Sequence, residues 1–190
     1  MYQVQLTLTK GDLHSTDHQN IDVSGAVLLP EIISTDTRLR KIALDLQADF
    51  RVRGELQVLA RLTIDPNFVI EFANDASLAV KNGGNIFADN TTFTAMDSGW
   101  KGICVETTGN TFANCVIENA GNVSFTGNEN EKAALLAYGN ATLAFSGNTL
   151  RNSGGYGIIM KDNADFFFDN PNQVYPYANN RFENNASGTG

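Results

Sequence analysis

The chain has 190 residues, which suits one domain, or one domain with a small appendage, and allows a sizeable buried core. Lys and Arg total 13 against 21 Asp and Glu, giving a net charge of −8. This acidity argues against sequence-independent binding to nucleic acid, which needs clustered cations to neutralise phosphate. No apolar run approaches the ~20 residues that cross a bilayer, so we expect no membrane-spanning segment.

The N-terminal stretch 2–9 alternates apolar and polar residues, which predicts a half-buried strand. We expect a polar loop over 10–20, where two histidines and two aspartates gather: His14, His18, Asp12 and Asp17. Such side chains can ligate a metal, but a spacing of four brings ligands together only on a helix, and this stretch lacks a helical apolar face. We therefore expect a solvated loop. Residues 1–40 as a whole are predicted to be a β-containing segment that caps or covers the remainder.

From about residue 41 the chain becomes a series of short apolar runs separated by polar corners. One family of equivalent residues recurs at intervals of 24, 33 and 32 residues: Phe93, Ile117, Leu150 and Phe182. Two further families are the pairs Ile103/Val105, Ala134/Leu136 and Ile158/Met160, and the pairs Leu78/Val80, Leu143/Phe145 and Phe166/Phe168. Self-similarity at this period indicates stacked repeats. Three strands per coil predict an all-β, single-stranded parallel β-helix of five to seven coils over 41–190.

The corners of this solenoid are predicted to depend on asparagine. Asn119, Asn152 and Asn184 each stand two places after a residue of the first family. Asparagine tolerates the left-handed backbone that a tight corner requires. We also expect these three side chains to form an internal amide ladder along the axis. Segment 122–132 is predicted to be a loop inserted into one coil, because the repeat interval lengthens from 24 to 33 residues there.

The second family has an unusual property: its strands are apolar on both faces. With the paired residues inward, the outward residues are Cys104, Leu135 and Ile159, and a register shift of one leaves both faces apolar. A strand of this kind is normally buried on both faces. We predict that residues 1–40, the loop 122–132 or another subunit covers this sheet, which would make a homo-oligomer possible. The two cysteines, Cys104 and Cys115, are expected to be buried thiols rather than a disulfide.

Several motifs resemble one protein family. They are LTIDPNFVIEF (62–72), ASLAV (76–80), WKGI (100–103), VIENAG (116–121) and NTLRNSGGYGI (148–158). Together they resemble the right-handed parallel β-helix proteins of the pectate-lyase-like superfamily, especially secreted or lipid-anchored members of the type found in Bacteroidetes. The resemblance covers roughly 42–188 and departs at Asn67, where the family usually has Gly.

The resemblance implies a right-handed coil and an extracytoplasmic location, either secreted, periplasmic or lipid-anchored at the cell surface. It supplies no settled activity. Residues 1–15 lack the basic start and apolar middle of a signal peptide. An exported protein with this sequence would therefore have lost its leader, and Met1 would then be artificial.

Catalytic members of the superfamily place their chemistry on outward residues of one sheet. Lyases use carboxylates for calcium with a Lys or Arg base, and hydrolases use paired carboxylates as general acid and base. Here an outward column of Glu118, Arg151 and Glu183 resembles a depleted catalytic face. Alternating charges on neighbouring strands also form a simple stabilising ladder, which we favour. A polysaccharide lyase or glycoside hydrolase acting on an extracellular polysaccharide stays open as the alternative function.

The leading function is a non-catalytic module that binds carbohydrate or a cell-surface partner. Its candidate binding residues are aromatic or adjacent to aromatic ones: Trp100, Lys101, Tyr156, Tyr175 and Tyr177. Aromatic platforms with polar neighbours grip sugar rings, although corner aromatics in solenoids also cover the ends of the core.

A polar corner could hold calcium through Asp162, Asn163, Asp165 and Asp169. Short polar side chains more often cap turns, so we expect no cofactor and keep calcium as the open alternative.

Overall fold

A computed structural model describes residues 2–10, 13–21, 25–40, 47–167 and 179–187. The first two of these segments form a hairpin, in which β1 (Tyr2–Lys10) pairs antiparallel with β2 (Leu13–Ile21). The strand predicted over 2–9 is confirmed, whereas the polar loop predicted over 10–20 is wrong because most of this stretch forms β2. A hairpin strand takes its backbone hydrogen bonds from its partner, so it needs no apolar run of its own.

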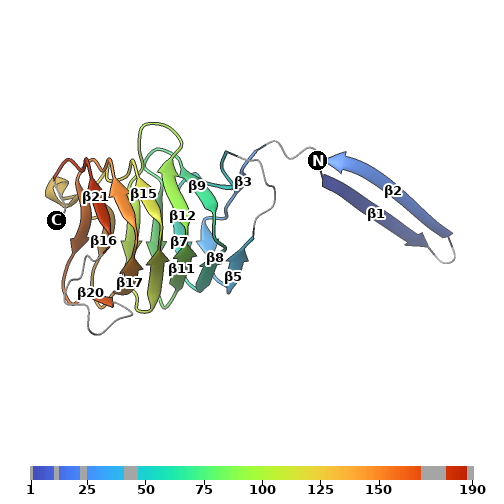
Figure 1. The fold of residues 1–190 in the computed structure, drawn as a ribbon. Helices are drawn as coiled ribbons and strands as arrows, with labels where there is room; N and C mark the ends of the chain where they lie inside the picture. The colour runs from blue at the N-terminus through green and yellow to red at the C-terminus, as the bar shows by residue number, and fades with distance from the viewer. Residues whose placement is uncertain (1, 11–12, 22–24, 41–46, 168–178, 188–190) are drawn as a thin grey trace.

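The remaining strands form three parallel sheets that wind into a solenoid (Figure 1). Sheet 1 contains β3 (Val27–Leu28), β6 (Phe50–Val52), β9 (Phe68–Phe72), β12 (Thr91–Ala95), β15 (Val116–Glu118), β18 (Thr149–Arg151) and β21 (Arg181–Glu183). Sheet 2 contains β4 (Ile32–Ile33), β7 (Glu55–Val58), β10 (Ser77–Val80), β13 (Gly102–Val105), β16 (Ala133–Ala137) and β19 (Tyr156–Met160). Sheet 3 contains β5 (Thr37–Leu39), β8 (Arg61–Ile64), β11 (Asn85–Asp89), β14 (Asn110–Ala113), β17 (Thr142–Ser146) and β20 (Asp165–Phe167).

Each coil gives one strand to each sheet in the order 1, 2, 3, so the chain makes a parallel β-helix of about six turns. This confirms the predicted fold class. The first coil is built from β3, β4 and β5, so the parallel sheets begin at Val27, inside the segment for which a cap or cover was predicted. The loop predicted over 122–132 lies between β15 and β16, and it contains a single 3₁₀ turn, η1 (Glu129–Glu131).

The interior of the coils is a column of stacked side chains. The first predicted family is confirmed, because Phe93 pairs with Ile117, Ile117 with Leu150, and Leu150 with Phe182 on successive strands of sheet 1. Aromatic rings continue the stacking inside, with centroids 5.4 to 6.5 Å apart along the series Phe72, Phe93, Phe112, Phe145 and Phe166. Burying each such side chain contributes about 1.5–3 kcal/mol, so the column supplies the main stabilising free energy of the coils.

The other two predicted families need correction. Leu78 and Val80 pair with Ile103 and Val105 in sheet 2, so they do not belong with Leu143 and Phe145, which lie in sheet 3. In-out alternation looks the same in all three sheets, and therefore does not reveal which sheet a strand joins. Phe168, also placed in that family, lies outside the described residues.

The strand β16 is displaced by one residue from its predicted register. Ile103 pairs with Leu135, and Val105 with Ala137, whereas Ala134 and Leu136 were expected at these places. All five residues of β16 are apolar, so the sequence pattern satisfies either register equally well.

The corner asparagines adopt the predicted backbone conformation. Asn119, Asn152 and Asn184 have φ values of 56°, 56° and 53°, in the left-handed region. Asn67 also has a left-handed φ, of 68°, a conformation that asparagine tolerates. The internal amide ladder predicted at the first three positions is wrong, however, because the side chains of Asn152 and Asn184 are exposed.

The buried amide ladder lies at the start of the sheet 1 strands instead. Asn148 is fully buried; its Oδ1 accepts the Cys115 N–H at 2.8 Å, and its Nδ2 donates to the Phe112 carbonyl at 2.9 Å. The Asn180 Oδ1 accepts the Asn148 N–H from the next coil at 2.9 Å. These side chains satisfy backbone groups at a corner where the sheet hydrogen bonds are interrupted.

Candidate functional site

The outward face of sheet 2 carries a row of apolar side chains in register: Ala79, Cys104, Leu136 and Ile159. The first three are only 5%, 5% and 1% exposed, although they lie outside the interior core cluster. The prediction that this sheet is buried on both faces is therefore confirmed over these strands. The prediction that Leu135 points outward is wrong, because Leu135 belongs to the core cluster. Leu136 occupies the outward position beside Cys104 instead.

The loop 122–132 lies beside this face and is attached to it at two points. The Lys101 ammonium lies 5.1 Å from the ring centroid of Phe125 in the loop, a cation–π contact. The Lys161 Nζ lies 2.8 Å from Glu131 Oε1. Of the covers predicted from the sequence, this loop contacts residues that flank the outer face of sheet 2, whereas Ile32 and Ile33 from the segment 1–40 join the sheet as its edge strand β4. A homo-oligomer through the same face stays a prediction.

Cys104 is expected to react with a thiol reagent about a thousandfold more slowly in the native protein than an ordinary thiol. Burial raises the pKa of the Cys104 thiol from 9.0 to about 12, with a smaller contribution from Glu106, and only the thiolate attacks the reagent. The rate should rise with pH below that value because the thiolate fraction grows.

The measurement is labelling of a Cys115→Ala variant, in which Cys104 is the remaining thiol. The same variant in denaturant gives the reference rate. Rapid labelling of the native variant would show that the outer face of sheet 2 is open.

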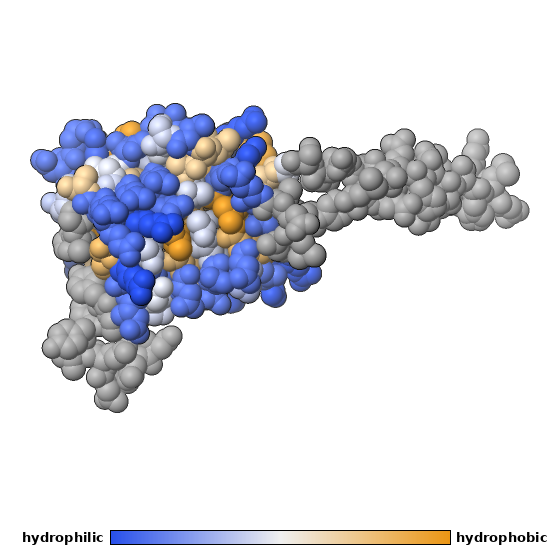
Figure 2. Space-filling view, turned by 45° about the horizontal axis from the view of Figure 1, so that its top comes forward, coloured by the Kyte–Doolittle hydropathy of each residue, from blue (hydrophilic) through white to orange (hydrophobic). Residues whose placement is uncertain are grey.

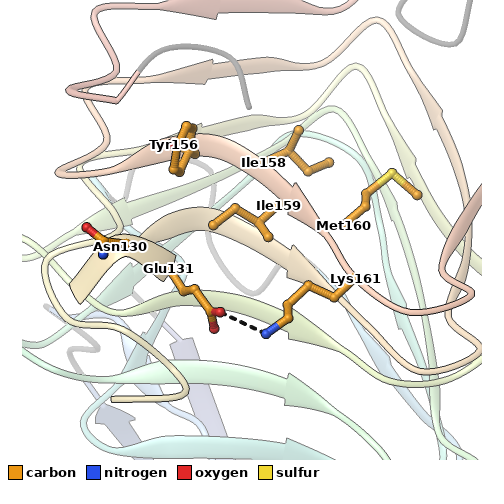
Figure 3. Close-up of a pocket in the computed structure, with 7 residues that line it drawn as sticks. All are labelled: Asn130, Glu131, Tyr156, Ile158, Ile159, Met160 and Lys161. Carbon is orange, nitrogen blue, oxygen red and sulfur yellow. Dashed lines mark hydrogen bonds and ion pairs between the residues drawn. The ribbon is translucent and has the colours of Figure 1, made fainter. Parts of the chain in front are cut away.

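A groove of about 420 Å³ lies at the C-terminal end of this face (Figure 3). Seven residues from β19, the loop and the position after β19 line it: Asn130, Glu131, Tyr156, Ile158, Ile159, Met160 and Lys161. In Figure 3 Ile159 points toward Glu131, and Ile158 lies on the other side of the strand. The groove thus combines an aromatic ring, aliphatic side chains and an ion pair.

The ion pair in this groove is charged at neutral pH. The pKa of Glu131 is held below its usual range by the hydrogen bond from Lys161 and by a second hydrogen bond from Thr126. Glu131 therefore offers carboxylate oxygens as acceptors, and Lys161 offers ammonium hydrogens as donors. Both side chains are partly exposed, so the pair itself contributes little to stability.

The face of the molecule drawn in Figure 2 is mainly polar. Figure 2 shows hydrophilic side chains over much of one face of the molecule, with smaller hydrophobic patches between them. Among the described side chains, the large hydrophobics that are clearly exposed are Leu28, Ile32 and Val123, and none of these lines the groove.

The predicted sugar-binding residues have different locations. Trp100 is fully buried and stacks on Phe72 at 4.0 Å, while its Nε1 donates to the Glu118 carbonyl at 2.9 Å. Trp100 therefore lies in the core cluster and is not one of the residues that line the groove. Lys101 contacts Phe125 and Tyr156 lines the groove. Tyr175 and Tyr177 lie outside the described residues.

The outward column on sheet 1 has the predicted register. Glu118 pairs with Arg151, and Arg151 with Glu183, on neighbouring strands. The Arg151 Nη2 lies 2.6 Å from Glu118 Oε2, and the Thr94 hydroxyl donates to Glu118 Oε1 at 2.9 Å. Both carboxylate oxygens of Glu118 therefore have partners within the sheet.

At the polar corner before β20, Asp162 and Asn163 form hydrogen bonds to the turn of the neighbouring coil. Asp162 has a φ of 60°, and its Oδ2 accepts the Gly139 N–H of the neighbouring coil at 3.1 Å. Asn163 donates to Asn140 Oδ1, Asp165 begins β20, and Asp169 lies outside the described residues. Within the described ranges no three His, Cys, Asp or Glu side chains are grouped as metal ligands. No helix in those ranges has the length and apolar character needed to span a membrane.

Comparison of the chain with protein-family models, with curated proteins and with solved structures finds no match. The candidate site therefore rests on the geometry of this chain alone. Of its residues, the sequence pointed to Tyr156 as a binding residue but not to Asn130, Glu131 or Lys161. The inserted loop was the available signal, because an insertion beside an apolar sheet face can supply a groove wall.

Proposed function

We propose that the chain is a non-catalytic, extracytoplasmic β-helix module that binds carbohydrate in the groove beside β19. The observation that carries the proposal is the combination of Tyr156 and aliphatic side chains with the charged Glu131–Lys161 pair in one groove. Membership of the pectate-lyase-like superfamily and the extracytoplasmic location belong to the same proposal. They are supported by the motif resemblance over 42–188.

The groove fits the chemistry of a sugar ring. A pyranose has C–H faces that pack on aromatic and aliphatic side chains, and hydroxyl groups at its edge that need donors and acceptors. Tyr156 and Ile159, on opposite faces of β19, supply the first kind of contact, and Glu131, Lys161 and Asn130 supply the second. A volume of about 420 Å³ lies within the range of ~300–1,000 Å³ for small-molecule sites and suits one or two rings.

Replacing Tyr156 with Ala is expected to weaken carbohydrate binding at least about tenfold, because the aromatic packing surface is lost. A glycan array of neutral and acidic oligosaccharides identifies the bound sugar for the wild type, and titration calorimetry then compares the variants with it. Phe87→Ala is the matched control: this half-buried aromatic lies on sheet 3, 4.3 Å beneath Arg61, and away from the groove.

Phe87→Ala should bind the same sugar as the wild type does. If the wild type binds no glycan on the array, or if Tyr156→Ala binds with unchanged affinity, the groove is not a carbohydrate site.

A second candidate function is a polysaccharide lyase or glycoside hydrolase. The observation in its favour is the register of Glu118, Arg151 and Glu183 on three adjacent strands, which aligns two carboxylates and a guanidinium on one face. Against it, Glu118 is already bound by Arg151 and Thr94. New reducing ends or unsaturated uronate absorbance after incubation with polysaccharides, lost in Arg151→Ala, would establish the enzyme instead.

A further inference from the structure

The hairpin β1–β2 stands apart from the rest of the fold. Its two strands form a sheet of their own, which is joined to none of the three solenoid sheets. Figure 1 shows the hairpin extending away from the end of the solenoid where β3 and β5 lie. A two-stranded hairpin is at best marginally stable in water, and three or more strands are needed for independent stability. A further strand on one of its free edges would therefore stabilise the hairpin.

The two free edges of this hairpin differ in charge. From Tyr2 to Thr9, β1 alternates apolar residues with Gln and Thr, and its one charged residue is Lys10 at the end. By contrast, β2 carries Asp17 in its middle and has His14 and His18 on either side. Charged residues on an edge strand oppose pairing, whereas a long, uncharged edge rich in β-forming residues is a template for another strand. The available edge is thus β1.

We propose that β1 pairs antiparallel with β1 of a second copy of this chain, forming a four-stranded sheet with β2 at each outer edge. Antiparallel pairing of identical strands has two-fold symmetry, so one contact closes the assembly as a dimer. With the two-fold axis at Leu6, Leu6 lies opposite Leu6 of the second copy, Val4 opposite Leu8, and Tyr2 opposite Lys10. Directly opposed apolar residues stabilise an antiparallel pair, and the central pairs of this register are apolar.

The charge distribution of the hairpin favours a second copy as the partner. The described hairpin strands contain one Lys and one Asp, so two hairpins meet without net repulsion, although each chain carries a net charge of −8. That negative charge resides in the remainder of the chain. It opposes close approach of two solenoids more strongly than close approach of two hairpins.

Light scattering coupled to size-exclusion chromatography of the full chain is expected to give twice the 20.6 kDa chain mass. Leu6→Lys places a charge in the middle of the paired edge and should give the monomer mass. Thr16→Lys is the matched control, because Thr16 lies at the middle of the outer strand β2, and this variant should remain a dimer. A monomeric wild type, a mass that keeps growing with concentration, or equal dissociation by both variants overturns the proposal.

Cysteine cross-linking separates loss of pairing from unfolding of the hairpin. Leu6→Cys should form a covalent dimer under mild oxidation, since opposed residues near the axis lie within the ~5.5 Å Cα separation of a disulfide. Thr16→Cys, on the outer edge, should not. Cross-linking of both variants to the same extent, or of neither, contradicts pairing through β1.

Discussion

Replacing Trp100 with Ala will lower the free energy of unfolding by about 4 kcal/mol. The indole is fully buried and stacked on Phe72, so its removal leaves a cavity at the core of the coil, at a cost of ~3–5 kcal/mol. It also removes the donor to the Glu118 carbonyl. Chemical denaturation followed by circular dichroism measures the change as a lower midpoint.

Trp100→Phe is the matched control for this prediction. It keeps an aromatic ring against Phe72 but loses the N–H, so it should cost less than the Ala variant, about 1–3 kcal/mol. If Trp100→Ala kept wild-type stability and lost glycan binding instead, Trp100 would be a binding residue after all, and the packing described here would be incorrect.

Replacing Asn148 with Ala will lower the free energy of unfolding by about 3 kcal/mol. The substitution leaves the Cys115 N–H and the Phe112 carbonyl without their side-chain partner inside the protein. Each buried group without a hydrogen bond costs ~1–3 kcal/mol. The same denaturation measurement applies, and protection of the Cys115 amide against hydrogen exchange should fall as well.

Asn140→Ala is the corresponding surface control. Asn140 is exposed in a turn between β16 and β17, and its Oδ1 accepts a hydrogen bond from Asn163 Nδ2 at 3.4 Å. Its replacement should change stability by less than ~0.5 kcal/mol. Equal losses from the two asparagines would show that burial of the amide ladder is not what stabilises this corner.

The sequence alone determined the architecture of this protein. Ile117, Leu150 and Phe182 could be assigned to one interior file because a parallel coil places equivalent residues of successive turns side by side, so the repeat interval gives the contact directly. Asn119 and Asn152 could be assigned to corners because few residues other than glycine adopt the left-handed backbone. The burial of sheet 2 on both faces could also be predicted, because its strands place apolar residues on both faces in either register.

Other features depend on groups that are brought together only by the fold. The register of β16 could not be predicted because Ala133–Ala137 is apolar throughout, and the strand β2 was missed because its backbone bonds come from β1. The inward position of Trp100 depends on its stacking against Phe72 from the preceding coil.

The groove beside β19 is the clearest case of a feature decided by tertiary structure. Glu131 and Lys161 are 30 residues apart in the chain, and neither belongs to a repeated motif. They meet because the inserted loop returns along the outer face of sheet 2. Periodicity reports which residues stack inside a coil, but it carries no information about where a loop outside the repeat will lie.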